Sequence, residues 1–506
     1  MTELNLVDQV HVEHVHKRQF RYYNLMVIGA MCFASMGMGY SASIIGTTLA
    51  QPSFLHYFKL DTRSDALSLI STMNGLFQAG AFFGSIGINV VADKFGRKMS
   101  ITIPCILVLI SGACLAGSVN VGMFIAFRFF SGMGSWWLLG AVPVWMSEVT
   151  PPKNRGMLVD CHSAALLFGY VSASWVGAGF YFYRPAANNQ WRAPLGFQCF
   201  PVFVALCFMY WLPESPRWLL QNDREEEARR VLLKLHDRDE ADLELQQIRN
   251  QITVDNRLEQ SWMSLLTKPS YRKRTYITVG LSFGIQMTGV LVINNYGPTI
   301  YASLGLDTSQ QLVYQGGFNT LAFGCGILAI FVVDRFPRQK LMSIGTAVVL
   351  ATLVIEAALV ASYPPTATQN PHALKAALAM IYLYIAFAEL LLDGTQYIYF
   401  SELWPNHLRA KGMTIAMATI ALVNIMWLQV APTAFANIGW KFYLCFIIPG
   451  YIFAVCCWIF FPDTRHLALE EIAAIFGDAD EIYRAPLEAT KISLDMAGKS
   501  EHSEDV

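Results

Sequence analysis

Two carboxylates lie among otherwise apolar residues in the second half of the sequence. Glu389 and Asp393 are four residues apart, which places both on one face of a helix. Polar groups inside long apolar stretches are costly, so each of them is a candidate for function. Two like charges this close disfavour each other, and the pair could therefore hold a proton. A structural ion pair of Glu389 is the alternative.

Amide and hydroxyl groups in other apolar stretches could bind a hydroxylated solute. A hydroxyl that loses water without gaining a partner costs about 1–3 kcal/mol, and an aromatic ring can cover the C–H face of a sugar. The candidate binding residues are Gln78, Ser163, Gln286, Asn294, Asn295, Gln396, Tyr397 and Asn424. For any single amide, the alternative is a hydrogen bond to a neighbouring helix.

A repeated pattern of charges lies at the ends of the apolar stretches. The repeated residues are Asp93 with Arg97, Glu148 with Arg155, Asp334 with Arg338, and Glu402 with Arg409. Carboxylate and guanidinium groups form strong charge-assisted pairs. We expect these pairs to join the two halves of the chain in one conformation and to break in another. The repeat itself predicts two similar helical bundles.

The stretches that carry these residues are long enough to cross a membrane. The 506-residue chain is 54% hydrophobic and 14% charged, with a mean hydropathy of +0.38, which is too apolar for a soluble enzyme. About 20 apolar residues cross a bilayer. The expected spans are 25–50, 67–92, 100–118, 121–146, 157–183, 193–212, 275–304, 312–333, 341–362, 378–401, 413–436 and 440–461. The sequence therefore predicts an all-α integral membrane protein, with twelve transmembrane helices in two six-helix bundles.

A charged linker divides the chain, and the basic residues predict its orientation. The expected order is a cytosolic segment 1–23, a bundle 24–212, a cytosolic linker with short helices 213–274, a bundle 275–461 and a cytosolic tail 462–506. Lys and Arg are concentrated in alternate short loops, so we expect both termini and the linker in the cytosol. The expected location is the plasma membrane, with the first span as the insertion signal.

Several motifs together resemble the major facilitator superfamily, and within it the sugar porter family. They are Asp93 to Lys98, Arg128 with Gly132 and Gly134, Ser147 to Gly156, Pro213 to Trp218, Tyr296 to Pro298 with Tyr301, Ser401 to Arg409, and Pro462 to Arg465. The resemblance covers about residues 20–475, and the phrase 44–54 is similar to fungal members. It implies a cargo site between two bundles, alternating access, and a hexose, pentose, disaccharide or polyol as cargo.

The chain departs from the family pattern at positions that would contact cargo. Members typically carry polar residues where this chain has Ile285, Leu291 and the short Ser163, and a Pro-rich run ending in Trp where it has Asp393 to Tyr397. A less hydroxylated cargo would explain the apolar replacements. An organic acid or an exported secondary metabolite is therefore the alternative to a sugar.

The first span bears on whether transport is coupled to protons. Proton-coupled members that resemble this chain carry Gly-Tyr-Asp there, and the Asp partners an Arg in span four. This chain retains Arg128 but has Ser41 in place of the Asp. A Ser hydroxyl does not titrate near physiological pH and cannot exchange a proton as an Asp does, so we expect facilitated diffusion. The alternative is coupling through Asp393 or Glu389.

These features predict a transporter for a sugar or a related polyhydroxylated solute. We expect no enzyme, no cofactor and no metal, because no nucleophile, phosphate or metal motif is evident, and the ten cysteines lack ligand spacing. The net charge of −1 gives no sign of nucleic-acid binding, and we expect a monomer in a lipid bilayer. A non-transporting sugar sensor is a third alternative, but it would be expected to have a longer cytosolic tail.

Overall fold

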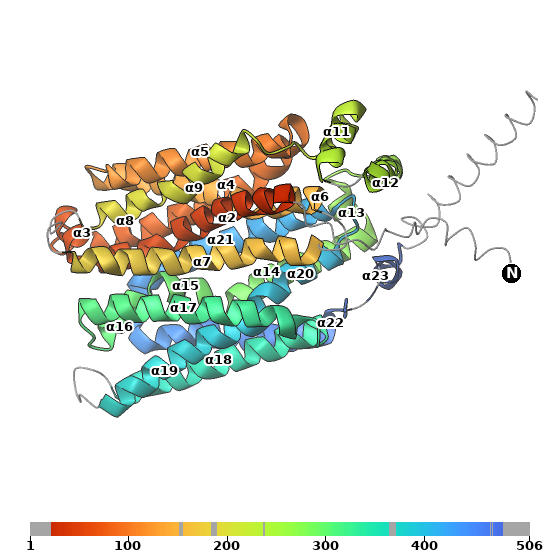
Figure 1. The fold of residues 1–506 in the computed structure, drawn as a ribbon. Helices are drawn as coiled ribbons and strands as arrows, with labels where there is room; N and C mark the ends of the chain where they lie inside the picture. Colours follow the sequence, from red (N-terminus) through yellow and green to blue (C-terminus); the bar gives the residue numbers. More distant parts are fainter. Residues whose placement is uncertain are drawn as a thin grey trace, which may run out of the picture.

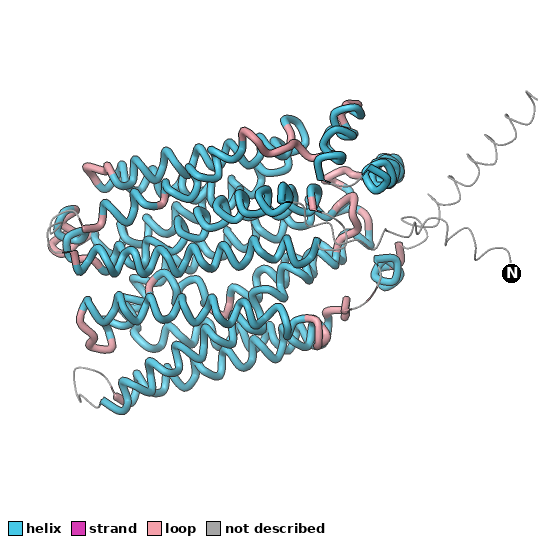
Figure 2. The backbone as a smooth tube through the Cα atoms, in the orientation of Figure 1, coloured by secondary structure: helices cyan, strands magenta, loops and turns pink. Residues whose placement is uncertain are grey.

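The structure is a computed structural model that describes residues 22–150, 155–183, 190–235, 238–363, 371–465, 467 and 469–478. Almost all of the described backbone is helical, and Figure 2 shows no strand in it. A helix satisfies its own backbone hydrogen bonds, which a chain in a lipid core must do. Most of the expected segment 1–23 and of the tail 462–506 lies outside the described residues.

The first half of the chain forms six spans. These are α2 (Tyr22–Ala50), α4 (Ala66–Phe95), α5 (Arg97–Ala116), α6 (Val121–Val149), α7 (Arg155–Phe182), and α8 (Arg192–Phe197) continued by α9 (Cys199–Met209). The short helix α3 (Pro52–Tyr57) follows α2.

The second half also forms six spans, several of them interrupted. They are α14 (Pro269–Gln286) with α15 (Val290–Asn295) and α16 (Gly297–Ser303); α17 (Thr308–Val333); α18 (Arg338–Ser362); α19 (Pro371–Ala388) with η3 (Glu389–Asp393) and α20 (Gly394–Leu403); α21 (Arg409–Ile438); and η4 (Gly439–Tyr443) with α22 (Leu444–Phe460). We call the two sets of spans the N-bundle and the C-bundle.

Short helices gather at one end of the bundles. They are α10 (Pro216–Gln221), α11 (Glu225–Leu235), α12 (Arg238–Arg257), α13 (Ser264–Thr267) and α23 (Leu469–Phe476). Figure 1 shows α11, α12, α13 and α23 on the right and α3, α8 and α16 at the opposite end. We call these the linker end and the far end.

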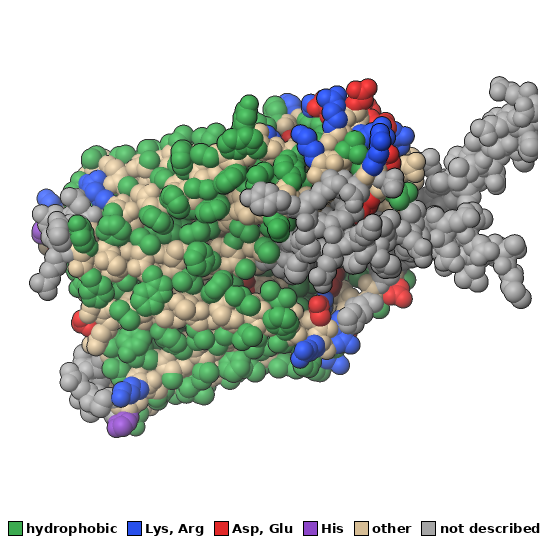
Figure 3. Space-filling model, in the orientation of Figure 1, with side chains coloured by type: hydrophobic (Ala, Val, Ile, Leu, Met, Phe, Trp, Pro, Cys, Tyr) green, Lys and Arg blue, Asp and Glu red, His purple; other side chains and the backbone are tan. Residues whose placement is uncertain are grey.

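The spans have the length and surface of membrane helices. Ten helical stretches of the described chain are long and apolar enough to cross a bilayer, and one of them, Arg409–Phe460, contains both α21 and α22. Helix α6 completes the twelve spans, and it buries Arg128, Ser131 and Ser135 among its apolar residues. In Figure 3, hydrophobic side chains cover the flank, and charged side chains gather mainly at the linker end.

Close contact between α4 and α6 depends on two glycines. A Cβ added to Gly80 would overlap the carbonyl oxygen of Phe129, and one added to Gly132 would overlap that of Phe77. Small residues let membrane helices approach to backbone contact, where dispersion replaces the hydrophobic effect. The packed helices α4 and α6 hold the centre of the N-bundle together.

Spans seven and ten differ from the continuous helices that the sequence predicts. Gly289 has a φ of +79°, a left-handed conformation that favours glycine and separates α14 from α15. Pro298 lies in the first turn of the next piece, α16, where its missing N–H is tolerated. In span ten, η3 is a π-helical turn, a feature that occurs frequently at functional sites. Both interruptions lie beside the cavity described below.

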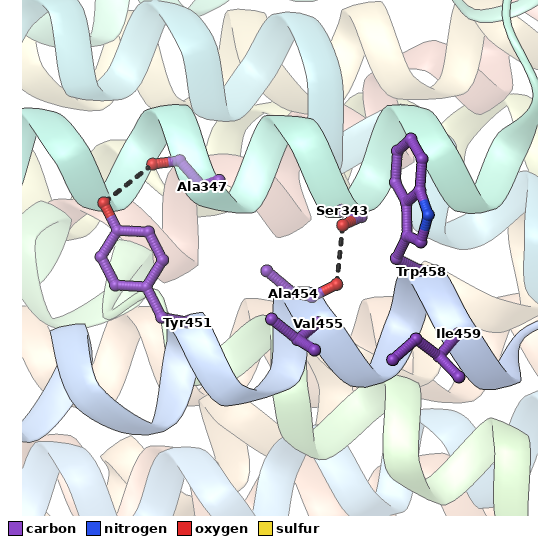
Figure 4. Close-up of a pocket in the computed structure, with 7 residues that line it drawn as sticks. All are labelled: Ser343, Ala347, Tyr451, Ala454, Val455, Trp458 and Ile459. Carbon is purple, nitrogen blue, oxygen red and sulfur yellow. Dashed lines mark hydrogen bonds between the residues drawn. The ribbon is translucent and has the colours of Figure 1, made fainter.

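A shallow groove of about 260 Å³ lies on the outer surface between α18 and α22 (Figure 4). Its polar groups are satisfied, because Ser343 donates to the carbonyl oxygen of Ala454 (2.6 Å) and Tyr451 to that of Ala347 (3.3 Å). The remaining lining is largely apolar. This groove suits contact with lipid chains and has no features of a polar binding site.

Candidate functional site

A cavity of about 1770 Å³ lies between the N-bundle and the C-bundle. Its lining comes from α2, α4, α6 and α7 on one side and from α14, α15, α17, η3, α20 and α21 on the other. It reaches the linker end, where Asp93, Arg97, Arg217 and Arg409 line its mouth. The cavity is therefore open toward the linker helices.

The far end of the interface is closed by hydrogen bonds between the bundles. Asn319 of α17 donates to Ser174 of α7 (2.6 Å) and to Ser43 of α2 (3.4 Å). The side-chain Oδ1 of Asn319 accepts a hydrogen bond from the side-chain amide of Asn294 of α15 (3.1 Å). One side chain of the C-bundle thus joins the broken span seven to two helices of the N-bundle.

Further hydrogen bonds reinforce this closure. The indole N–H of Trp175 donates to Thr320 (3.0 Å), and Gln429 of α21 donates to Ser71 of α4 (3.3 Å). Helices α4 and α21 also stay joined nearer the linker end, where Asn89 donates to Thr414 (2.7 Å). The bundles therefore meet at the far end and along α4 and α21.

The structure brings all eight predicted binding residues into the cavity lining. Gln78 and Ser163 belong to the N-bundle, and the other six are Gln286, Asn294, Asn295, Gln396, Tyr397 and Asn424 of the C-bundle. Ile285 and Leu291, which replace polar residues of the family pattern, also line the cavity. The lining thus mixes amide and hydroxyl groups with apolar surface.

Sequence reasoning missed several residues of the lining. Asn319, His162 and Tyr170 all contribute to it. Asn319 could have been selected by the rule that selected the other amides, since it lies in the apolar stretch 312–333. Nothing local distinguishes Tyr170 from the many aromatic residues that face lipid.

The two carboxylates of η3 face this cavity, halfway along span ten. Asp393 accepts a hydrogen bond from Gln396 (3.0 Å). Glu389 is 8% exposed, and its Oε2 has no hydrogen-bond partner in the described part of the chain. Tyr170 of α7 and Tyr397 of α20 lie within electrostatic range of both carboxylates.

Lys and Arg side chains line the cavity only at its mouth, as far as the structure describes it. They are Lys94, Arg97, Arg217, Arg409 and Lys411, at the ends of spans or in the linker. The lining around η3 therefore carries two carboxyl groups without a neighbouring Lys or Arg among the described residues.

Arg128 is a buried cation of α6 that lies outside the cavity lining. It is 1% exposed and donates to the carbonyl oxygens of Ser41 (3.3 Å) and Met73 (3.4 Å). Its guanidinium also lies 4.2 Å from the ring centroid of Phe77. The hydroxyl of Ser41 pairs with Ser131 (2.7 Å). Carbonyl oxygens and a ring thus surround a guanidinium that faces Ser41, where proton-coupled members carry an Asp.

At the linker end, Arg97 is the centre of a charged cluster in the N-bundle. It pairs with Glu148 (3.2 Å) and Asp93 (3.3 Å). The backbone N–H groups of Arg97 and Lys98 donate to Glu214 (2.9 and 3.1 Å). Burial raises the pKa of Glu214, although these N–H groups act in the opposite direction.

Arg338 has the corresponding position in the C-bundle. It pairs with Asp334 (2.9 Å) and Glu402 (3.2 Å), and its backbone N–H donates to Asp463 (3.3 Å). Thr464 adds a hydrogen bond to Glu402 (2.6 Å). The sequence repeat therefore folds into two clusters of matching design.

These ion pairs correct one expectation. Arg97 and Arg338 bind carboxylates of their own bundle, because the acid and the base of each repeat lie on neighbouring helices of one bundle. In this conformation the pairs stabilise each bundle and do not join the two. Arg409 lines the cavity mouth, and the side chain of Arg155 lies outside the described part.

Comparisons with known proteins agree with this architecture. A family model described as "Sugar (and other) transporter" matches residues 27–476. The MFS-type transporter criB of Aspergillus cristatus is 30% identical over 460 residues, covering 90% of this chain and 93% of that protein. The high-affinity glucose transporter of Kluyveromyces lactis is 26% identical over 534 residues, covering 99% of this chain and 96% of that protein.

A solved structure has the same fold. The inward open conformation of the xylose transporter XylE from E. coli matches with a TM-score of 0.74 and 23% identity, covering 90% of this chain and 100% of that one. The predicted fold class, twelve transmembrane helices in two bundles, is confirmed.

Proposed function

The chain is a multi-pass membrane transporter of the sugar (and other) transporter family, and we propose that it moves a polyhydroxylated small solute by alternating access. The observation that carries this proposal is the cavity between the bundles, open at the linker end and closed at the far end. A solute in such a cavity contacts both bundles. Rocking of one bundle against the other would then expose it at the opposite end.

The polar lining supports a hydroxylated cargo. Gln78 and Ser163 face the cavity from the N-bundle, and Gln286 and Asn424 face it from the C-bundle. Amides supply both donors and acceptors, which suits hydroxyl groups that do both. Tyr397 and Trp136 supply rings for the C–H faces of a sugar.

We place the linker end in the cytosol of the cell. The loops at that end carry the excess of Lys and Arg, which the positive-inside rule assigns to the cytosol. In that orientation the cavity faces inward. We further propose that the transporter works as a monomer in the plasma membrane.

Facilitated diffusion is the mode that position 41 supports. Ser41 offers no acid, and Arg128 is compensated by carbonyl oxygens and a ring instead of a carboxylate. Coupling to protons would have to use another acid, and Glu389 and Asp393 line the cavity. This alternative is tested together with the cargo below.

A less hydroxylated cargo is the second candidate, and Ile285 and Leu291 in the lining favour it. An organic acid fits less well. Its carboxylate would meet Glu389 and Asp393 without a neighbouring Lys or Arg in the described lining, and like charges in a low-dielectric site repel.

The test is uptake of radiolabelled glucose, xylose, lactose and a polyol panel in transporter-null yeast, with and without a protonophore. Saturable uptake that the protonophore leaves unchanged is the expected result. Gln286→Ala should reduce kcat/KM about tenfold or more, because a hydroxyl would lose its amide partner. Ser343→Ala, in the outer groove, is the control. Absence of uptake of every hydroxylated solute, with the protein at the cell surface, would refute the proposal.

A further inference from the structure

The carboxylates of Glu389 and Asp393 lack a compensating charge in the cavity. Glu389 is more than nine-tenths buried, lines the cavity and keeps Oε2 without a hydrogen-bond partner in the described chain. Asp393, one turn further along span ten, accepts one hydrogen bond from Gln396. A carboxylate taken out of water must either gain a positive partner or take up a proton. The cavity therefore offers a place for a positive group.

Three arginines in or beside the described lining are engaged elsewhere. Arg97 binds Glu148, and Arg217 binds Asp255 (2.6 Å), both at the linker end. Arg128 lies outside the lining and is held by carbonyl oxygens. The imidazole of His162 also lines the cavity; its Nδ1 pairs with Ser35 (2.7 Å), and its Nε2 has no hydrogen-bond partner in the described chain.

Two tyrosines complete the surroundings of the carboxylates. Tyr170 comes from the N-bundle and Tyr397 from the C-bundle, and both line the cavity near Glu389 and Asp393. A cation gains energy over the face of an aromatic ring, most where water is excluded. A positive group here would touch both bundles.

We propose that the cargo carries an amine, whose ammonium group binds between Glu389 and Asp393 while its hydroxyls bind the amides of the lining. The chemical class is an amine-bearing polyhydroxylated small solute, such as an amino sugar. This inference rests on the proposed function, because it takes the cavity as the cargo site. Gln286 and Asn424, which also line it, are the amides assigned to the hydroxyls.

The mode of transport follows from the charge of the cargo. An ammonium that moves inward by facilitated diffusion carries one positive charge across the membrane. Its accumulation then depends on the membrane potential, without any proton-binding residue in span one.

The first experiment compares glucosamine and glucose uptake in transporter-null yeast at about pH 5, where an amine of this kind is protonated. The expected result is a kcat/KM about tenfold or more higher for glucosamine. Asp393→Asn should lower this preference about tenfold or more, and Asp393→Glu should restore part of it. Glu356→Gln is the matched control, because Glu356 is another buried carboxylate whose oxygens lack partners in the described chain, but it lies in α18 outside the cavity.

A binding measurement removes the dependence on turnover. The purified full-length protein is heated with glucosamine, glucose or butylamine, and the rise in Tm is compared at equal concentrations. Glucosamine should raise Tm more than glucose does, and Asp393→Asn should abolish the difference.

The outcomes separate the two proposals. Equal uptake of glucose and glucosamine overturns the proposal that the cargo carries an amine, and it leaves the proposed function standing. A third outcome is that the protonophore inhibits glucose uptake and that Asp393→Asn loses this inhibition. It would show that the carboxylates hold a proton, and it would also overturn the proposal that the cargo carries an amine. If butylamine is taken up and bound but no hydroxylated solute is, the result supports an amine-binding site and refutes a polyhydroxylated cargo. Uptake of none of these solutes, with no rise in Tm, refutes both.

Discussion

The two ends of the interface between the bundles are built from different chemistry. At the far end, neutral amides and hydroxyls join the bundles, with Asn319 bound to Ser174 and Ser43. At the linker end, charged clusters form around Arg97 and Arg338, each inside its own bundle. The end that is closed here uses weak contacts between bundles, and the end that is open uses strong contacts within them.

This difference matches what alternating access requires. A neutral hydrogen bond contributes about 0.5–1.5 kcal/mol, so a few of them can form and break during a cycle. Removing one partner of a buried ion pair costs about 3–5 kcal/mol. We infer that the charged clusters keep each bundle rigid, while the amide contacts act as the reversible closure.

The largest effect is expected at a charged cluster. Arg338→Ala would leave Asp334 and Glu402 without their cation, so the free energy of unfolding should fall by about 3–5 kcal/mol. A lower Tm of the purified protein is the measurement. Arg335→Ala, an exposed arginine of the same loop, should change Tm little.

The N-bundle cluster gives the matching test. In Arg97→Ala that reaches the membrane, conformational cycling should slow more than cargo affinity falls. A variant with weaker binding and normal turnover would show that Arg97 belongs to the cargo site, which would remove the contrast between the two ends.

An intermediate effect is expected at the far end. Asn319→Ala removes two hydrogen bonds between the bundles, which together contribute about 2 kcal/mol. The population should shift about 30-fold toward a state open at the far end. Faster hydrogen exchange in α16 would report it. Asn222→Ala, whose side chain bonds within the linker, should leave α16 unchanged.

A smaller effect is expected for Trp175→Phe, which removes only the hydrogen bond to Thr320. The loss of about 1 kcal/mol corresponds to a shift of about fivefold in the same exchange measurement. An effect equal to that of Asn319→Ala would mean that the far end opens as one indivisible unit.

The smallest effect concerns Glu214 at the linker end. Burial raises its pKa above the ordinary value of 4.5, so the folded protein holds this proton to higher pH than the unfolded chain does. The contribution of Glu214 is therefore largest in acid and declines as pH rises through the raised pKa. Glu214→Gln should make the decline in Tm above about pH 4.5 less steep. An unchanged slope would contradict the raised pKa.

The sequence predicted the spans and most of the candidate site, because these depend on local properties. Twelve apolar stretches match the twelve spans, since the length of a stretch and its lack of charge decide whether it can cross a bilayer. All eight polar residues selected as costly in such stretches line the cavity. Their role in binding remains a prediction.

Other features depended on contacts between distant segments. The repeat of Arg97 and Arg338 was evident in the sequence, but their partners within one bundle became visible only when the helices were placed side by side. The breaks at Gly289 and η3 interrupt stretches whose hydropathy is continuous. Tyr170 has no local signal of its own.

Hydropathy and charge along the chain determined that this protein crosses the membrane twelve times in two related halves. The tertiary structure decided which end of the cavity is open, which amides close the other end, and that Glu389 and Asp393 share the cavity with Tyr170. The physical reason is that insertion into a bilayer depends on each stretch by itself, whereas the charge balance of a cavity depends on side chains from both bundles.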